Sequence, residues 1–135
     1  MVVKVLLDTN AYSALMRGIP SVVDKVRNAE QVFLSTIVIG ELLYGFRYGG
    51  RFEKNLDILQ RFLENAYITL LPATYVTADR FSLLATALRR KGKPMPTNDI
   101  WIAAHTLESG ADLLSYDDHF SHLDGLPWHR LRDST

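Results

Sequence analysis

Short apolar runs alternate along the chain with longer stretches in which apolar residues recur every three or four positions. The runs are mainly aliphatic and β-branched, as buried strands are, and they span residues 2–7, 32–34, 68–71 and 112–114. A short fifth strand is also expected near residues 129–131. The periodic stretches predict helices over residues 11–17, 21–29, 36–48, 52–65, 75–90 and 98–107. Thr9 or Asn10 is the expected cap of the first helix, and Ser35 or Thr36 that of the third.

This alternation predicts an α/β fold. Strands joined by helical segments pair in parallel, and the helices then cover both faces of the sheet. We therefore expect a central parallel sheet of about five strands flanked by helices. The chain has no repeat or long linker, and its 135 residues fit one domain, so we expect a single domain over residues 1–135.

Composition narrows the possible chemistry. Fifteen basic and fifteen acidic residues give zero formal net charge, so total charge is no evidence for a nucleic-acid partner. The chain has no cysteine, which excludes disulfides, zinc–thiolate sites and thiol catalysis. It has neither a signal-peptide pattern nor an apolar run approaching the ~18 residues of a membrane span. We expect a cytoplasmic protein without membrane contact.

One carboxylate stands alone in an apolar segment. Glu41 is the only charged residue of VFLSTIVIGELLYGF, residues 32–46. A carboxylate removed from water without a partner costs several kcal/mol or becomes protonated. Glu41 is therefore either solvated on an exposed helix face or paired with a group outside this segment.

Three further acids occupy positions where α/β proteins form sites. Asp8 follows the first strand, Asp117 follows the strand that ends near residue 114, and Asp99 lies in the first turn of a predicted helix. The helix dipole is expected to keep Asp99 ionised at neutral pH. Each acid alone is also explained as a turn or cap residue. If all four acids converge, a divalent cation is needed to balance them, and oxygen ligands favour Mg²⁺ or Mn²⁺.

The segments that carry these acids resemble one known family. VKVLLDTN, STIVIGELLYG, TNDIWIAAHTL and LLSYDDHF stand in the order and spacing of PIN domains, in particular VapC-type toxins of toxin–antitoxin pairs. The resemblance covers nearly the whole chain. It implies a PIN-like three-layer sandwich and a Mg²⁺- or Mn²⁺-dependent ribonuclease. It also implies a cognate VapB-type antitoxin and a homodimer.

The resemblance assigns the site residue by residue. Asp8 and Asp99 are the expected core metal ligands, with Glu41 beside them and Asp117 as the fourth acid. Asp118 is adjacent to Asp117, so the choice between these two stays open.

Three polar residues match the supporting positions of the family. Ser115 stands where many members have a threonine hydroxyl, and Asn10 and Asn98 match polar neighbours of the first and third acids. The expected reaction is endonucleolytic cleavage of RNA phosphodiester bonds by metal-activated water, leaving a 5′-phosphate and a 3′-hydroxyl without a cyclic product. Two alternatives remain: a PIN nuclease of RNA processing without an antitoxin, and a non-catalytic PIN-fold binding module.

Two other α/β classes fit less well. A phosphoaspartyl phosphatase needs a second acid two residues after the first, where this chain has Asn10. A receiver domain needs paired acids after the first strand and an aspartate after a central strand, and residues 68–74 hold no acid.

Several residues near these motifs are candidates for substrate and partner contacts. The basic run Arg89, Arg90, Lys91 and Lys93 either binds RNA phosphates or is a solvated helix end. His105 and His119 are either phosphate contacts or surface residues, and a surface position is favoured because a lone histidine lacks a partner at metal-ligand spacing. Those of Tyr44, Phe46 and Tyr48 that are not core would form an apolar patch for the antitoxin.

Overall fold

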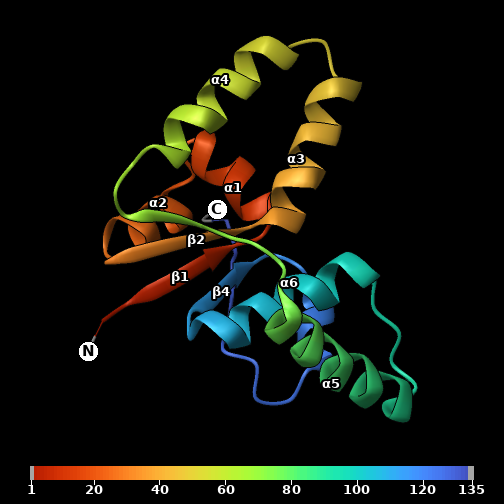
Figure 1. The fold of residues 1–135 in the computed structure, drawn as a ribbon. Coiled ribbons are helices and arrows are strands. Elements are labelled where there is room, and N and C mark those ends of the chain that lie inside the picture. Colours follow the sequence, from red (N-terminus) through yellow and green to blue (C-terminus); the bar gives the residue numbers. More distant parts are fainter. Residues whose placement is uncertain (1, 134–135) are drawn as a thin grey trace.

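Five parallel strands form one twisted sheet in this computed structural model, which describes residues 2–133 (Figure 1). The sheet order is β3-β2-β1-β4-β5. The strands are β1 (Lys4–Leu7), β2 (Gln31–Ser35), β3 (Ile68–Leu71), β4 (Asp112–Ser115) and β5 (Trp128–Arg130). β1 pairs with β2 on one side and with β4 on the other, both in parallel.

The helices form two layers around this sheet. They are α1 (Thr9–Met16), α2 (Pro20–Arg27), α3 (Thr36–Tyr48), α4 (Phe52–Leu63), α5 (Tyr75–Lys91) and α6 (Thr97–Ser109), with a short 3₁₀ helix η1 (Asp118–His122). In Figure 1, α5 and α6 lie on one side of the sheet and α1 to α4 on the other. Right-handed crossovers explain this division, because the chain runs outward from β1 to β3 and then returns across the sheet to β4.

The predicted α/β architecture is confirmed. The observed boundaries lie within two residues of the predicted ones, and those of β3 coincide with them. Ser35 caps α3, since its hydroxyl accepts from the Ile37 amide at 3.0 Å. The predicted cap of the first helix is wrong: Asp8, not Thr9 or Asn10, precedes α1, and its side chain accepts from the Ala11 amide at 2.9 Å. η1 was not predicted.

The core lies on both faces of the sheet. Leu6 and Leu7 of β1 and Leu113 and Leu114 of β4 are fully buried, although neighbouring residues of a strand point to opposite faces. Burial on both faces explains why these strands are continuous apolar runs rather than alternating ones. Within residues 2–133, no helix has the length and apolar character needed to cross a membrane.

Candidate metal centre

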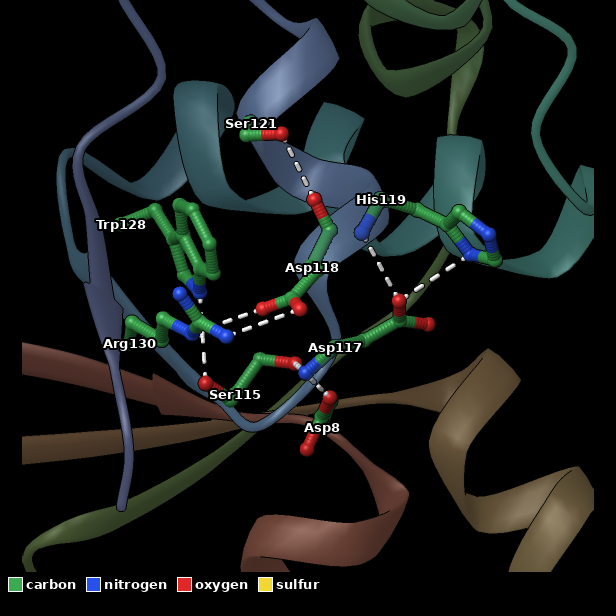
Figure 2. A network of polar contacts seen from close by, with 8 residues as sticks. All are labelled: Asp8, Ser115, Asp117, Asp118, His119, Ser121, Trp128 and Arg130. Atoms are coloured by element: carbon green, nitrogen blue, oxygen red, sulfur yellow. Dashed lines mark hydrogen bonds and ion pairs between the residues drawn. The ribbon is translucent and has the colours of Figure 1, made fainter.

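The predicted acids meet at the carboxyl ends of β1 and β4. This is the point at which the order of the strands reverses, since β1 lies between β2 and β4. Asp8 directly follows β1, and the hydroxyl of Ser115, the last residue of β4, donates a hydrogen bond to Asp8 Oδ2. The Ser115 oxygen in turn accepts from the Asp117 amide at 2.9 Å (Figure 2). Ser115 therefore links the first acid to the turn that carries the fourth.

Asp8 is a buried carboxyl group with only 6% of its surface exposed. Burial raises its pKa to about 6, against the lowering effect of hydrogen bonds from Ser115 and the Ala11 amide. The negative charges of Asp117 and Glu41 raise it further. The first acid thus lies in a pocket where negative charge is not balanced by the protein.

Asp99 is in the same pocket, in the first turn of α6. Its pKa is raised to about 7 by partial burial first, then by the charge of Asp117 and a hydrogen bond with it, and then by Glu41 and Asp8. The helix N-terminus is expected to keep Asp99 ionised, whereas burial and the three neighbouring acids favour its protonated form in the metal-free protein.

Glu41 has two neutral hydrogen-bond partners from other elements. Thr9 Oγ1 donates to Glu41 Oε1 at 2.6 Å, and Asn98 Nδ2 donates to Oε2 over a longer 3.4 Å. Glu41 therefore joins α3 to the starts of α1 and α6. Neither partner carries a positive charge, so the carboxylate is oriented but its charge is not neutralised by them.

The two adjacent aspartates of the last motif point in different directions (Figure 2). Asp117 Oδ1 accepts from the His119 amide at 2.9 Å and lies 3.0 Å from His119 Nδ1. Asp118 forms a two-bond ion pair with Arg130 of β5, at 2.7 and 2.8 Å. Of these two, Asp117 is the one that acts on the pKa of both Asp8 and Asp99.

Sequence reasoning missed two residues of this site. The sequence indicates Thr9 only as a helix cap, and His119 only as a surface residue or a phosphate contact. His119 is exposed, yet one side-chain atom of each of Asp99, Asp117 and His119 lies within 4.8 Å of the others. The Asp-x-His spacing from 117 to 119 within a turn was the signal that points to this arrangement.

The expected surface position of His105 is wrong. Its side chain is fully buried on the inner face of α6. Its Nδ1 lies 2.7 Å from the Ser35 hydroxyl and its Nε2 lies 3.2 Å from the Pro72 carbonyl oxygen. Hydrogen-bond partners at both nitrogens explain how a polar ring is accommodated in the core.

The remaining sequence candidates lie around the acids. Asn10 is exposed in the first turn of α1. Arg89, Arg90 and Lys93 are exposed at the end of α5 and in the loop after it. Lys91 is engaged within the chain, since its ammonium group lies 2.8 Å from Asp124 and donates to the His122 carbonyl at 2.9 Å.

The side chains present fit a hard divalent cation. Asp8, Asp99, Asp117 and Glu41 offer carboxylate oxygens. Burial is the main cause of the raised pKa values of Asp8 and Asp99, and the neighbouring acids raise them further, a repulsion that a cation would relieve. A cleft of about 650 Å³ opens beside them, lined in part by Thr9, Glu41, Tyr44 and Asn98. Of the four acids, Glu41 is the one that lines this cleft.

Comparison with known proteins gives consistent matches. The PIN domain family model matches residues 5–126. Ribonuclease VapC2 of Haemophilus influenzae (strain ATCC 51907 / DSM 11121 / KW20 / Rd) is 31% identical over 114 residues, which are 83% of this chain and 85% of the relative. The tRNA(fMet)-specific endonuclease VapC of Shigella flexneri is 26% identical over 126 residues, 91% of this chain and 94% of the relative.

The fold is also similar to a solved toxin–antitoxin complex. A chain of VapBC2 from Rickettsia felis, bound to a DNA fragment from its promoter, superposes with a TM-score of 0.83 at 24% identity. The match covers 96% of this chain and 99% of that chain. At this identity, the likeness shows the fold.

Proposed function

This chain belongs to the PIN-domain family, among the VapC-type ribonucleases, and from that premise we propose that it is a Mg²⁺- or Mn²⁺-dependent endoribonuclease acting as the toxin of a toxin–antitoxin pair. The observation that carries the proposal is the meeting of Asp8, Asp99 and Asp117 at the switch point of the sheet, with Glu41 beside them. The whole chain is proposed to form one PIN domain.

The acids have distinct proposed roles. Asp8 and Asp99 would hold the cation, and Glu41 and Asp117 would be its remaining carboxylate neighbours. When bound, a divalent cation supplies an activated water and neutralises the charge that develops on the phosphate. Asp117 or Glu41 would orient the attacking water and accept its proton. Attack on phosphorus with cleavage of the P–O3′ bond, and protonation of the departing 3′ oxygen by solvent, would leave a 5′-phosphate and a 3′-hydroxyl.

Polar neighbours keep these carboxylates in place. Ser115 donates to Asp8 and accepts from the Asp117 backbone, so it sets the distance between the first and fourth acids. Thr9 and Asn98 each donate to one oxygen of Glu41. Since the donors come from three different elements, the pocket is pre-organised by the fold before any ligand binds. Asn10 is proposed as a polar neighbour of Asp8 that contacts substrate or solvent.

RNA binding is assigned to the exposed basic residues that precede α6. Arg89, Arg90 and Lys93 are free to contact phosphates, whereas Lys91 is already paired with Asp124. The first three are therefore proposed to contribute more to RNA affinity than Lys91 does.

The proposed partner is a VapB-type antitoxin. VapBC2 from Rickettsia felis was solved as a toxin–antitoxin assembly, and its chain has the same fold as this one. Tyr44 and Tyr48 stack on each other with 6.3 Å between ring centroids on the exposed side of α3, and they are 71% and 86% exposed. Such an aromatic surface supports partner binding. A homodimer and a cytoplasmic location complete the proposal.

The test is metal-dependent stabilisation followed by RNA cleavage. A cation that binds only the folded state raises the melting temperature, and at 100 times its dissociation constant it adds about 2.7 kcal/mol. We expect Mn²⁺ and Mg²⁺, compared with EDTA, to stabilise the wild type but not Asp8→Asn, and RNA cleavage to follow the same pattern. A wild type that millimolar Mn²⁺ neither stabilises nor activates contradicts the proposal.

A further inference from the structure

We propose that His119 contributes an imidazole nitrogen to the metal site, which makes the ligand set mixed oxygen and nitrogen and favours Mn²⁺ over Mg²⁺. This inference rests on the metal-dependent function proposed above. It concerns a residue outside the four acids and specifies which cation the site prefers.

The distances around His119 match those between ligands of one ion. In an octahedral site with bonds of about 2.1 Å, neighbouring ligand atoms lie roughly 3 Å apart and opposite ones roughly 4 Å apart. His119 Nδ1 lies 3.0 Å from Asp117 Oδ1. Side-chain atoms of Asp99, Asp117 and His119 all lie within 4.8 Å of one another. A single cation can therefore contact all three residues after only small side-chain movements.

The turn that carries His119 is anchored on both sides. Phe120, the next residue, is 1% exposed and packs in the core. Asp118, the preceding residue, is paired with Arg130 (Figure 2). The His119 amide also donates to Asp117 Oδ1. These contacts keep the imidazole on the same side of the turn as Asp117, so little ordering is needed for it to bind an ion.

The nitrogen changes the selectivity expected of the site. Mg²⁺ takes oxygen ligands almost exclusively, whereas imidazole suits transition-metal ions. Four carboxylates alone would accept either ion. A nitrogen donor beside them favours Mn²⁺, because Mn²⁺ accepts imidazole and carboxylate ligands in one coordination shell.

A positioning role is the competing explanation for the same contact. In that case His119 only holds Asp117 by a hydrogen bond, and the ion contacts oxygen alone. Removing His119 would weaken binding under both explanations, so affinity does not separate them. Direct detection of a metal–nitrogen bond does.

The test is pulsed electron paramagnetic resonance of the 135-residue protein loaded with Mn²⁺. His119→Gln is the test variant, and His129→Gln is the matched control. His129 is similarly exposed, 48% against 52%, and its Nε2 lies 3.2 Å from Asp112 at the opposite end of β4. Melting in EDTA checks that both variants fold.

We expect a ¹⁴N coupling to Mn²⁺ in the wild type and in His129→Gln, and its loss in His119→Gln. Titration calorimetry should show Mn²⁺ affinity falling by about tenfold or more in His119→Gln, with a much smaller change for Mg²⁺. Bound Mn²⁺ without a ¹⁴N coupling, or a coupling that persists in His119→Gln, overturns the role of His119 and leaves the proposed function standing. Failure of the wild type to bind Mn²⁺ at all overturns both.

Discussion

The imidazole Nδ1 of His105 lies 2.7 Å from the Ser35 hydroxyl, and this contact joins the helix that carries Asp99 to the cap of the helix that carries Glu41. The Pro72 carbonyl can only accept, so Nε2 of His105 carries the ring proton and Nδ1 accepts from Ser35. The Ser35 oxygen remains free to accept from the Ile37 amide. One buried ring thus sets the position of α6 against α3.

We expect His105→Phe to lower the free energy of unfolding by about 1–3 kcal/mol, because it leaves the Ser35 hydroxyl and the Pro72 carbonyl without their partner. Urea denaturation measures this loss. Ser35→Ala removes the other side of the contact together with a helix cap worth about 1 kcal/mol. The double variant should be less destabilised than the sum of the two single variants. Effects that add to within about 0.5 kcal/mol would mean that the two side chains do not stabilise each other.

The buried acids make the stability of the metal-free protein depend on pH. The pKa of Asp8 is raised to about 6 by burial, so between pH 4 and 6 the folded state binds more protons than the unfolded state. Protonated Asp8 therefore stabilises the fold at pH 4, and this stabilisation is lost as the pH rises from 4 through about 6. Between pH 4 and 8 in EDTA, we expect the free energy of unfolding of the wild type to fall by on the order of 2–3 kcal/mol more than that of Asp8→Asn.

His105 also makes the free energy of unfolding depend on pH, and its effect has the opposite sign. Burial lowers the pKa of His105, so its protonation in the unfolded state destabilises the fold as pH falls below about 6.5. His105 is present in both proteins, so its contribution cancels in the difference between wild type and Asp8→Asn. That difference reports Asp8 together with the effect of its charge on Asp99. Parallel stability curves for the two proteins would show that Asp8 does not retain its proton in the folded state.

The adjacent acids Asp117 and Asp118 provide a matched pair of variants. Asp117→Asn should reduce the Mn²⁺-induced rise in melting temperature and abolish RNA cleavage, because Asp117 faces Asp99. Asp118→Asn breaks an exposed ion pair with Arg130, so it should cost at most about 1 kcal/mol and leave metal binding unchanged. Loss of metal binding in Asp118→Asn alone would exchange the two assignments.

The salt dependence of RNA binding tests the basic residues. Binding of a catalytically inactive Asp8→Asn protein to single-stranded RNA is measured by fluorescence anisotropy over a range of salt. Each lost phosphate contact should lower the slope of log affinity against log salt by about 0.7. We expect this lower slope for Arg89→Ala and for Arg90→Ala. Lys91→Ala should lower the slope less, because the Lys91 ammonium is already paired with Asp124.

Arg61→Ala is the control for these variants. Arg61 is exposed on α4, in the opposite helix layer, and it pairs with Asp57 at 3.1 Å. Its removal should change neither RNA affinity nor the slope. Equal slopes in all four variants would exclude the end of α5 from the RNA site.

The elements of the fold and the neighbourhood of the acids were determined by the sequence. Apolar periodicity is a local property, so it predicted strands and helices to within two residues. Parallel strands bring their carboxyl ends to one edge, and this predicted that Asp8 and Asp117 lie at the same edge of the sheet. Asp99 was identified as a candidate site residue from its position in the first turn of a predicted helix.

Only the tertiary structure decided which neighbours each polar side chain has. The turn after β4 separates Asp117 from Asp118, the packing of α6 buries His105, and Thr9 reaches Glu41 from another helix. The pKa of Asp99 likewise depends on its burial and on acids brought from three other segments. These properties come from contacts between residues distant in the chain, and local patterns carry no information about them.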